Sequence, residues 1–218
     1  MDDNKALTLA SNERIPLTPP MRLLLEIENM SQASPATVSR GGVIFMNSTD
    51  VGWLPYVKSW IQNREVDHER VLLTSLFEKY AGKSMEWVSR NVRTIVPIPE
   101  ISMVQSLTHI IEGMVGNGEE LLHLVKTTGQ EAGNKMMEMI FMYATIWSTA
   151  GAIISDKQND FRGAFDKWFR TEFAEPVQLP EEGTVFDFWV DKEQIAFANW
   201  AKRTASYSHD PAQVFGNI

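Results

Sequence analysis

The stretch MMEMIFMYATIWSTAGAII, residues 136–154, is the longest apolar segment of the chain and decides its fold class. Glu138 interrupts it, and further polar residues follow at Tyr143, Thr145, Ser148 and Thr149, which is not typical of a membrane span. Its apolar side chains recur at the spacing of one helix face, at Met136, Met137, Ile140, Phe141, Ala144, Trp147 and Ile154. We therefore predict a buried helix of a soluble protein, with the cytoplasm as the default compartment and no membrane partner.

The helical period extends from this stretch back towards the N-terminus, as far as Trp53. It is carried by Trp53, Val57, Trp60 and Ile61, and then by Val71, Leu72, Leu76, Phe77 and Tyr80. Pro97 and Pro99 break the pattern before another helix opens at Ser102, and Gly116–Gly118 predicts a loop. Residues 53–154 are therefore predicted to form a helical bundle attached to a sheet domain.

The regions on either side of the bundle show other patterns. Towards the N-terminus we predict a small hairpin that turns at Asn12, followed by two continuously apolar runs, Met21–Ile27 and Val43–Met46. Such runs are typical of central strands in a parallel sheet that is covered on both faces. After the bundle we predict an amphipathic helix over residues 160–173, then an alternating strand over residues 183–190.

Composition and missing motifs exclude several classes of function. The net charge of −8 does not suit a nucleic-acid partner, and four scattered histidines with no cysteine predict no metal site. The sequence contains no Gly-x-x-x-x-Gly-Lys-Ser/Thr loop and no apolar strand that ends in an acidic pair. A Gly-x-Ser-x-Gly elbow is absent as well, so nothing supports a hydrolase that acts alone.

One arginine stands out at the end of the segment SPATVSR, residues 34–40, which is followed by Gly41-Gly42 and the run Val43–Met46. The pattern predicts a short helical turn that ends at Arg40, directly before a buried strand. Two interpretations stay open. Arg40 is either a cap at the C-terminal end of a helix, or a guanidinium that contacts a phosphate held by a neighbouring subunit or module.

Several segments, in the same order, resemble the second AAA+ module of dynein heavy chains. They are Met1–Leu17, Ser34–Arg40, Gly52-Trp53, Val96–Glu100 with Ser102–Gln105, Ile146–Ser148 and Gly183–Phe188. The resemblance covers essentially the whole chain, and axonemal heavy chains match better than the cytoplasmic one. It implies an α/β plus all-α fold, a partial AAA+ module followed by the entry segment of the next.

The resemblance also implies three domains and a place in a motor. Residues 1–52 would be the C-terminal part of the parallel-sheet large subdomain, residues 53–156 the helical small subdomain, and residues 157–218 the start of the next module. The chain would belong to the ATP-driven ring of a minus-end-directed microtubule motor for ciliary movement. We expect it in the cytoplasm and cytoskeleton, in the axoneme of a cilium or flagellum.

By the same resemblance, Arg40 is the arginine finger that reaches in trans to the nucleotide of the first module. ATP with magnesium is implied for the complete motor, and none for the isolated chain, which lacks the Walker A and Walker B motifs. The implied partners are neighbouring AAA+ modules of the same heavy chain, and, through the full motor, intermediate and light chains and microtubules.

Two further expectations concern weaker features. Asn29 lies just past the run Met21–Ile27, where AAA+ modules place a polar sensor, although a turn residue is the other interpretation. The segment Phe141–Trp147 offers no second sensor arginine. The alternative function is a truncated, non-catalytic interaction module. We expect residues 1–52 of the isolated chain to aggregate or unfold in part, because a sheet cut after its Walker strands exposes apolar edges.

Overall fold

The computed structural model describes residues 6–116, 118–155 and 158–203, and the chain divides into two compact units between Asp50 and Val51. Each unit is described by itself. Among the described residues, no helix combines the length and the apolar character that crossing a bilayer requires.

The first unit opens with the hairpin that the sequence predicts. β1 (Ala6–Thr8) pairs antiparallel with β2 (Arg14–Pro16). Asn12 takes a left-handed backbone conformation with φ of 65°, which asparagine tolerates better than most residues. The unit continues with the short helix α1 (Pro35–Arg40), and α2 (Ser48–Val51) crosses the division between the units.

The two apolar runs of the first unit do not form the predicted central strands, so this part of the parallel-sheet prediction is wrong. Residues 21–27 and 43–46 carry no strand, and the sheets of the described residues are two antiparallel pairs, β1–β2 and β3–β4. The reason is physical. A strand is held by hydrogen bonds to neighbouring strands, and no such neighbour is paired with either run.

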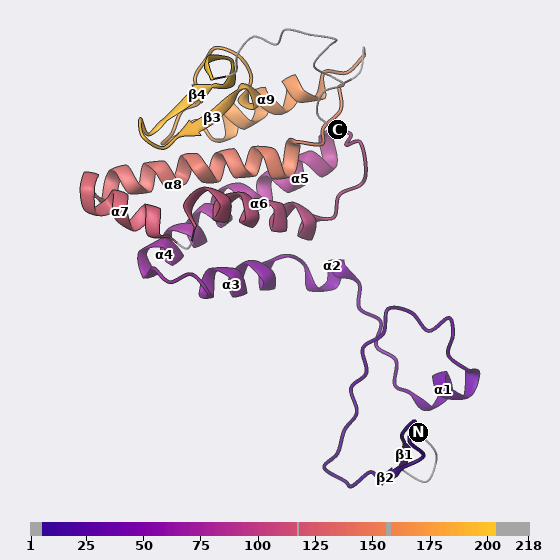
Figure 1. Ribbon diagram of the computed structural model, residues 1–218. Coiled ribbons are helices and arrows are strands. Elements are labelled where there is room, and N and C mark those ends of the chain that lie inside the picture. The colour runs from indigo at the N-terminus through magenta and orange to yellow at the C-terminus, as the bar shows by residue number, and fades with distance from the viewer. Residues whose placement is uncertain (1–5, 117, 156–157, 204–218) are drawn as a thin grey trace, which may run out of the picture. The chain divides into compact units, whose positions relative to one another are not determined.

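The second unit is a bundle of helices, as the sequence predicts (Figure 1). Its helices, in chain order, are α3 (Leu54–Gln62), α4 (Asp67–Leu76), η1 (Phe77–Ala81), α5 (Gly82–Asn91), α6 (Glu100–Val115), α7 (Glu119–Thr128), α8 (Gln130–Thr145), η2 (Ile146–Ala150) and α9 (Phe161–Glu172). Pro99 caps the N-terminal end of α6, which confirms that the proline pair breaks the helical pattern.

The core of the bundle lies where two long helices meet. One long helix consists of α4, η1 and α5, which follow each other without a break, and the other consists of α8 and η2. The segments η1, in the middle of the first, and η2, at the end of the second, are π-helical. Phe77 of η1 and Phe141 of α8 contact edge to face, with ring centroids 4.9 Å apart. Both side chains are buried, so the predicted buried helix over residues 136–154 is confirmed through Ala150.

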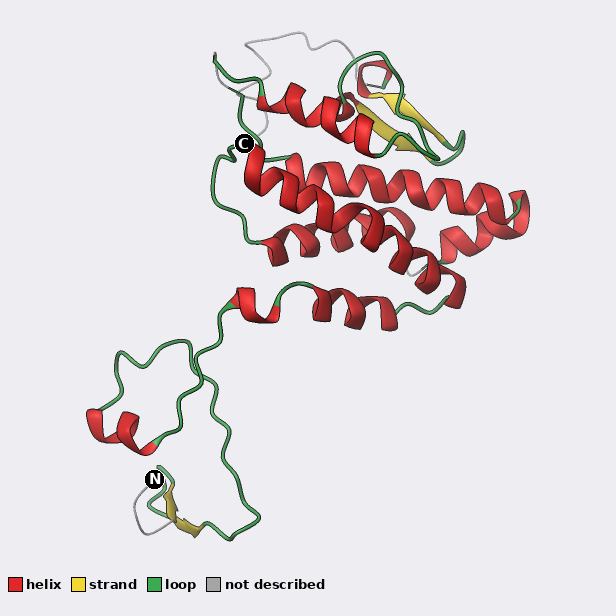
Figure 2. Ribbon diagram, turned by 180° about the vertical axis from the view of Figure 1, so that it is seen from behind, coloured by secondary structure: helices red, strands yellow, loops and turns green. Residues whose placement is uncertain are grey.

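The last part of the described chain packs onto the same bundle, with α9 against α5 and with the hairpin of β3 (Phe188–Asp191) and β4 (Ala196–Asn199) against α8 (Figure 2). Only the second half of the strand predicted over residues 183–190 forms. Its first half is the 3-10 turn η3 (Val185–Asp187), because Asp187 and Thr184 cap each other in a capping box. A second 3-10 turn, η4 (Trp200–Lys202), follows β4.

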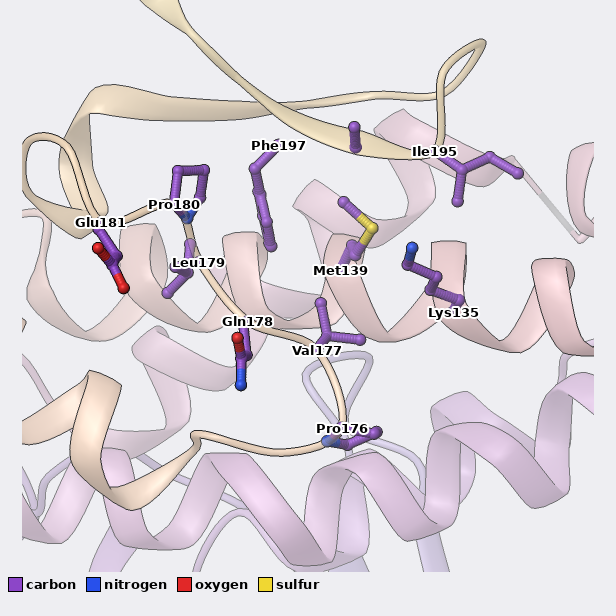
Figure 3. A pocket seen from close by; sticks show the side chains of 11 residues that line it. Lys135, Met139, Pro176, Val177, Gln178, Leu179, Pro180, Glu181, Ile195 and Phe197 are labelled. Atoms are coloured by element: carbon purple, nitrogen blue, oxygen red, sulfur yellow. The ribbon is translucent and has the colours of Figure 1, made fainter.

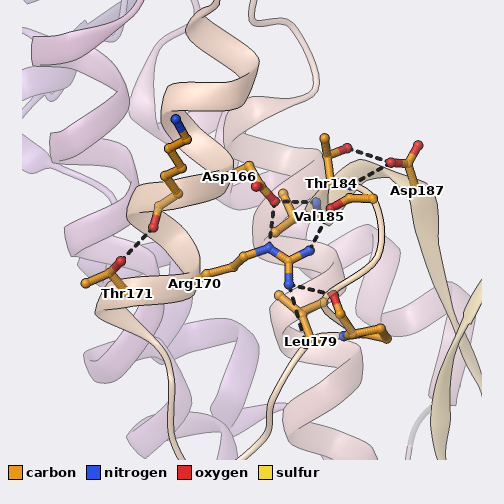
Figure 4. Close-up of polar contacts among 10 residues, drawn as sticks. Asp166, Arg170, Thr171, Leu179, Thr184, Val185 and Asp187 are labelled. Atoms are coloured by element: carbon orange, nitrogen blue, oxygen red, sulfur yellow. Dashed lines mark hydrogen bonds and ion pairs between the residues drawn. The ribbon is translucent and has the colours of Figure 1, made fainter.

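A clamp of polar contacts fixes the loop between α9 and η3 (Figure 4). Arg170 donates from Nε to Oδ1 of Asp166 at 2.9 Å, and from its two terminal nitrogens to the carbonyls of Pro180 at 2.6 Å and Gly183 at 3.2 Å. The same Asp166 oxygen accepts from the backbone N–H of Val185 at 2.7 Å. A planar guanidinium suits this role, since its donors point in several fixed directions.

Candidate functional site

The segment around Arg40 folds into a short helix that ends at Arg40, as predicted, and the helix is capped at its N-terminal end. Ser34 is the N-cap of α1, and its Oγ accepts a hydrogen bond from the backbone N–H of Thr37 at 3.2 Å. Pro35 occupies the first helical position, where a missing N–H costs nothing. The helix ends at Arg40 because Gly41 turns to an extended conformation with φ of −96°.

Arg40 is thus the last residue of α1, while its side chain lies outside the part of the chain that the structure describes. The sequence predicts a buried strand immediately behind it, and that strand is absent from the described residues. Instead the following run is open to solvent, with Ile44 86% and Phe45 80% exposed.

The run that precedes α1 is open in the same way. Leu24 is 97% and Leu25 is 87% exposed. Consecutive side chains of a strand point to opposite faces, so a strand of this composition needs cover on both faces. Neither leucine has that cover in this unit. Large exposed apolar groups therefore lie on both sides of α1 in the sequence.

Asn29 lies in a turn within this open segment. Its Oδ1 accepts hydrogen bonds from the backbone N–H of Ser31 at 3.2 Å and from the Ser31 hydroxyl at 2.6 Å. This is the local bonding expected of a turn asparagine. The sensor role remains a prediction, and no hydrogen bond of the described atoms joins Asn29 to α1.

The second unit contains cavities that the sequence did not predict. One of about 550 Å³ lies between α8, the segment Pro176–Glu181 and β4 (Figure 3). Its charged lining residues are Lys135 and Glu181, and no nucleophile with an adjacent base is among the lining side chains. Over the described ranges, no three His, Asp or Glu side chains gather as metal ligands would. This cavity therefore offers no catalytic grouping of its own.

Sequence reasoning located α1 and Arg40 but missed the residues that hold the helix. The signal was present, because serine is a favoured N-cap and proline is favoured at the first position of a helix. Thr37 completes that cap through a second contact, with its Oγ1 2.9 Å from Oγ of Ser34.

The comparison with known proteins supports the resemblance found in the sequence. Residues 73–202 match the family described as the dynein heavy chain AAA lid domain. The chain is 45% identical over 214 residues to the dynein beta chain of the flagellar outer arm of Chlamydomonas reinhardtii. It is 43% identical over 211 residues to the ciliary dynein beta chain of Heliocidaris crassispina, and 42% identical to dynein axonemal heavy chain 9 of Homo sapiens.

Each of these alignments covers 97% of this chain but only 4% of the relative. The chain thus spans about one twenty-fifth of the length of the curated relatives it matches. The prediction that it resembles axonemal heavy chains is confirmed, and so is the helical part of the fold. The chain belongs to the dynein heavy chain family and carries the AAA lid domain of that family over residues 73–202.

Proposed function

We propose that the chain is part of the ATP-driven ring of an axonemal dynein heavy chain, a minus-end-directed microtubule motor of cilia and flagella. Its relatives are named as ciliary, flagellar and axonemal dyneins. In the complete motor, ATP with magnesium binds to modules that carry Walker motifs, which this sequence lacks. Intermediate chains, light chains and microtubules are partners of that whole motor.

Within the ring, we assign residues 1–52 to the large subdomain of the second AAA+ module and residues 53–156 to its helical small subdomain. Residues 157–218 begin the third module. The division of the chain between Asp50 and Val51 supports the first boundary. α9 and the β3–β4 hairpin pack onto α5 and α8, so the entry to the third module would be anchored on the small subdomain of the second.

Arg40 is the arginine finger of this proposal. A guanidinium held against the γ-phosphate of a neighbouring module stabilises the charge that spreads over the transferring phosphoryl group. The observation that carries the assignment is the setting of Arg40. Arg40 is the last residue of a capped helix, and the runs before and after this helix are apolar and exposed to solvent, with Leu24 97% and Ile44 86% exposed. Exposed apolar side chains are expected beside a contact between modules of a ring.

The test is ATP turnover by a complete heavy chain that carries Arg40→Ala. An arginine supplied in trans contributes on the order of 10³ in rate or more, so turnover should fall by about that factor. Arg22→Ala is the matched control, because Arg22 is an exposed arginine of the same unit whose guanidinium, among the described residues, donates to the nearby carbonyls of Pro19 and Met21. Turnover that is equal in the two variants would remove the finger assignment.

A second candidate is a non-catalytic interaction module formed by the short chain. It is favoured by the second unit, which buries its own core around Phe141, Leu107 and Phe165. Sedimentation of the 218-residue chain distinguishes the two. A monodisperse folded species would support the interaction module, and aggregation through the first unit would support the ring fragment.

A further inference from the structure

Among the residues that the structure describes, nothing packs over the helix that carries Arg40. α1 has six residues, and residues 34–39 are all exposed. Isolated helices shorter than about 12 residues are marginal in water, because the first turn fixes several dihedral angles for one hydrogen bond. The helical state of α1 therefore depends on bonds made within the segment itself.

Side chains at the N-terminal cap supply two of those bonds, beside the backbone bonds from the N–H groups of Thr37 and Val38 to the carbonyl of Ser34 at 2.9 and 3.1 Å. Ser34 Oγ accepts from the N–H of Thr37 at 3.2 Å and lies 2.9 Å from Thr37 Oγ1, so two side chains close the first turn. At the other end, the N–H of Gly41 reaches the carbonyl of Val38 only at 3.4 Å. Within α1 the hydroxyl of Ser39 donates to the carbonyl of Ala36 and caps neither end.

We propose that Ser34 and Thr37 are positioning residues for Arg40, and this inference rests on the proposed finger. They keep α1 wound and thereby set the place from which Arg40 extends. Six residues span about 9 Å as a helix and about 20 Å as an extended chain, so unwinding shifts Arg40 by roughly 10 Å relative to Ser34. A shift of only 1 Å at a reacting centre can lower a rate by about 10².

The experiment uses complete heavy chains with Ser34→Ala, Thr37→Val or Ser34→Asp. Loss of an N-cap shifts the equilibrium between helix and unwound chain by roughly 2- to 30-fold, so kcat for ATP should fall by about fivefold in Ser34→Ala, with KM unchanged. Thr37→Val loses only the contact between the two hydroxyls, so its kcat should fall by less. Aspartate is also a good N-cap, so Ser34→Asp should keep the parental kcat. Ser39→Ala is the matched control within α1, and its kcat should equal that of the parent.

A double variant separates positioning from a general structural role. If Ser34 acts through Arg40, then Ser34→Ala lowers kcat no further in a chain that already carries Arg40→Ala. An equal loss in both backgrounds would overturn the inference, as would parental turnover of Ser34→Ala beside a slow Arg40→Ala. Normal turnover of Arg40→Ala itself would instead refute the finger, so the two failures are distinguishable.

Discussion

Tyr80 donates a hydrogen bond from its phenolic oxygen to Oε1 of Glu138 at 2.6 Å, and so joins the π-helical segment η1 to α8 inside the bundle. Lys79 reaches the same carboxylate oxygen at 2.7 Å. One carboxylate therefore binds two consecutive residues of the facing helix. The Tyr80 side chain is fully buried, which makes the bond sensitive to the ionisation of either partner.

Tyr80→Phe removes this hydrogen bond and keeps the ring. We expect the free energy of unfolding of the chain to fall by about 1.5–3 kcal/mol, the usual range for a hydrogen bond to a charged group. Urea denaturation at neutral pH measures it. Tyr143→Phe is the control, because Tyr143 is half-buried and its hydroxyl makes no hydrogen bond to the described residues. A loss of equal size in both variants would contradict the assigned role of Glu138.

The same tyrosine predicts a pH dependence. Burial raises the pKa of Tyr80 far above its ordinary value of 10.0, and the hydrogen bond to Glu138 and the charge of Glu138 raise it further. The raised pKa contributes stability that is fully present below pH 10 and is lost as the pH rises from there through the pKa of the folded state. Urea denaturation between pH 8 and 11 should show a shallower decline for Tyr80→Phe than for the parent chain.

A buried charge pair, Arg64 with Glu69, predicts non-additive effects. Arg64 and Glu69 pair at 2.7 Å with side chains 3% and 0% exposed, and Arg64 also donates to the carbonyl of Gly116 at 2.5 Å. Glu69→Ala alone leaves a buried charge without its partner, so the free energy of unfolding should fall by about 3–5 kcal/mol. The double variant Arg64→Met with Glu69→Leu should lose less than Glu69→Ala, as measured by urea denaturation. A double loss that equals the sum of the losses of Arg64→Met and Glu69→Leu, each made singly, would exclude coupling of the pair.

The exposed runs beside α1 predict self-association of the short chain. Ile44 and Phe45 are 86% and 80% exposed. The double variant Ile44→Lys with Phe45→Lys should lower the fraction of self-associated chain measured by sedimentation velocity, because the added charges oppose apolar contact between chains. Val71→Lys is the control, since Val71 is also 72% exposed but lies on a helix of the second unit. If Val71→Lys dissolves the aggregates equally well, the runs are not the cause.

The clamp at Arg170 predicts local order in the loop that follows α9. Arg170→Lys keeps the charge but loses the fork that holds the carbonyls of Pro180 and Gly183. Amide hydrogen exchange over residues 179–185 should become faster by tenfold or more, whereas Arg90→Lys, in a surface pair with Glu86, should leave it unchanged. Unchanged exchange in Arg170→Lys would show that the loop is held by other contacts.

The helical bundle and the β1–β2 hairpin were predictable from the sequence, whereas the prediction of a parallel sheet was wrong. α6 and α8 satisfy their own backbone bonds, so the spacing of residues such as Leu107 and Ile140 was enough to place them. The run Met21–Ile27 has the composition of a central strand, but its bonds must come from other strands, and local pattern says nothing about whether those are present. β4 was missed because Ala196–Asn199 is neither clearly alternating nor continuously apolar.

The candidate site, too, was predictable from the sequence only in part. SPATVSR predicted the helix and its end at Arg40, because caps and proline act locally. What covers Leu24 and Ile44 is not encoded in the segment itself, so the surroundings of α1 could not be predicted from it. The bonds of Asn29 to Ser31 are equally local, and they agree with the turn interpretation without testing a sensor role.

In the motor that we propose, the guanidinium of Arg40 acts on the nucleotide of a neighbouring module. The most direct measurement is single-turnover ATP hydrolysis by complete heavy chains with Arg40→Lys and Arg40→Ala, at saturating ATP. Lysine keeps the charge but not the planar fork, so both variants should be slowed to a similar extent, on the order of 10³. Near-parental hydrolysis by Arg40→Ala would contradict the claim.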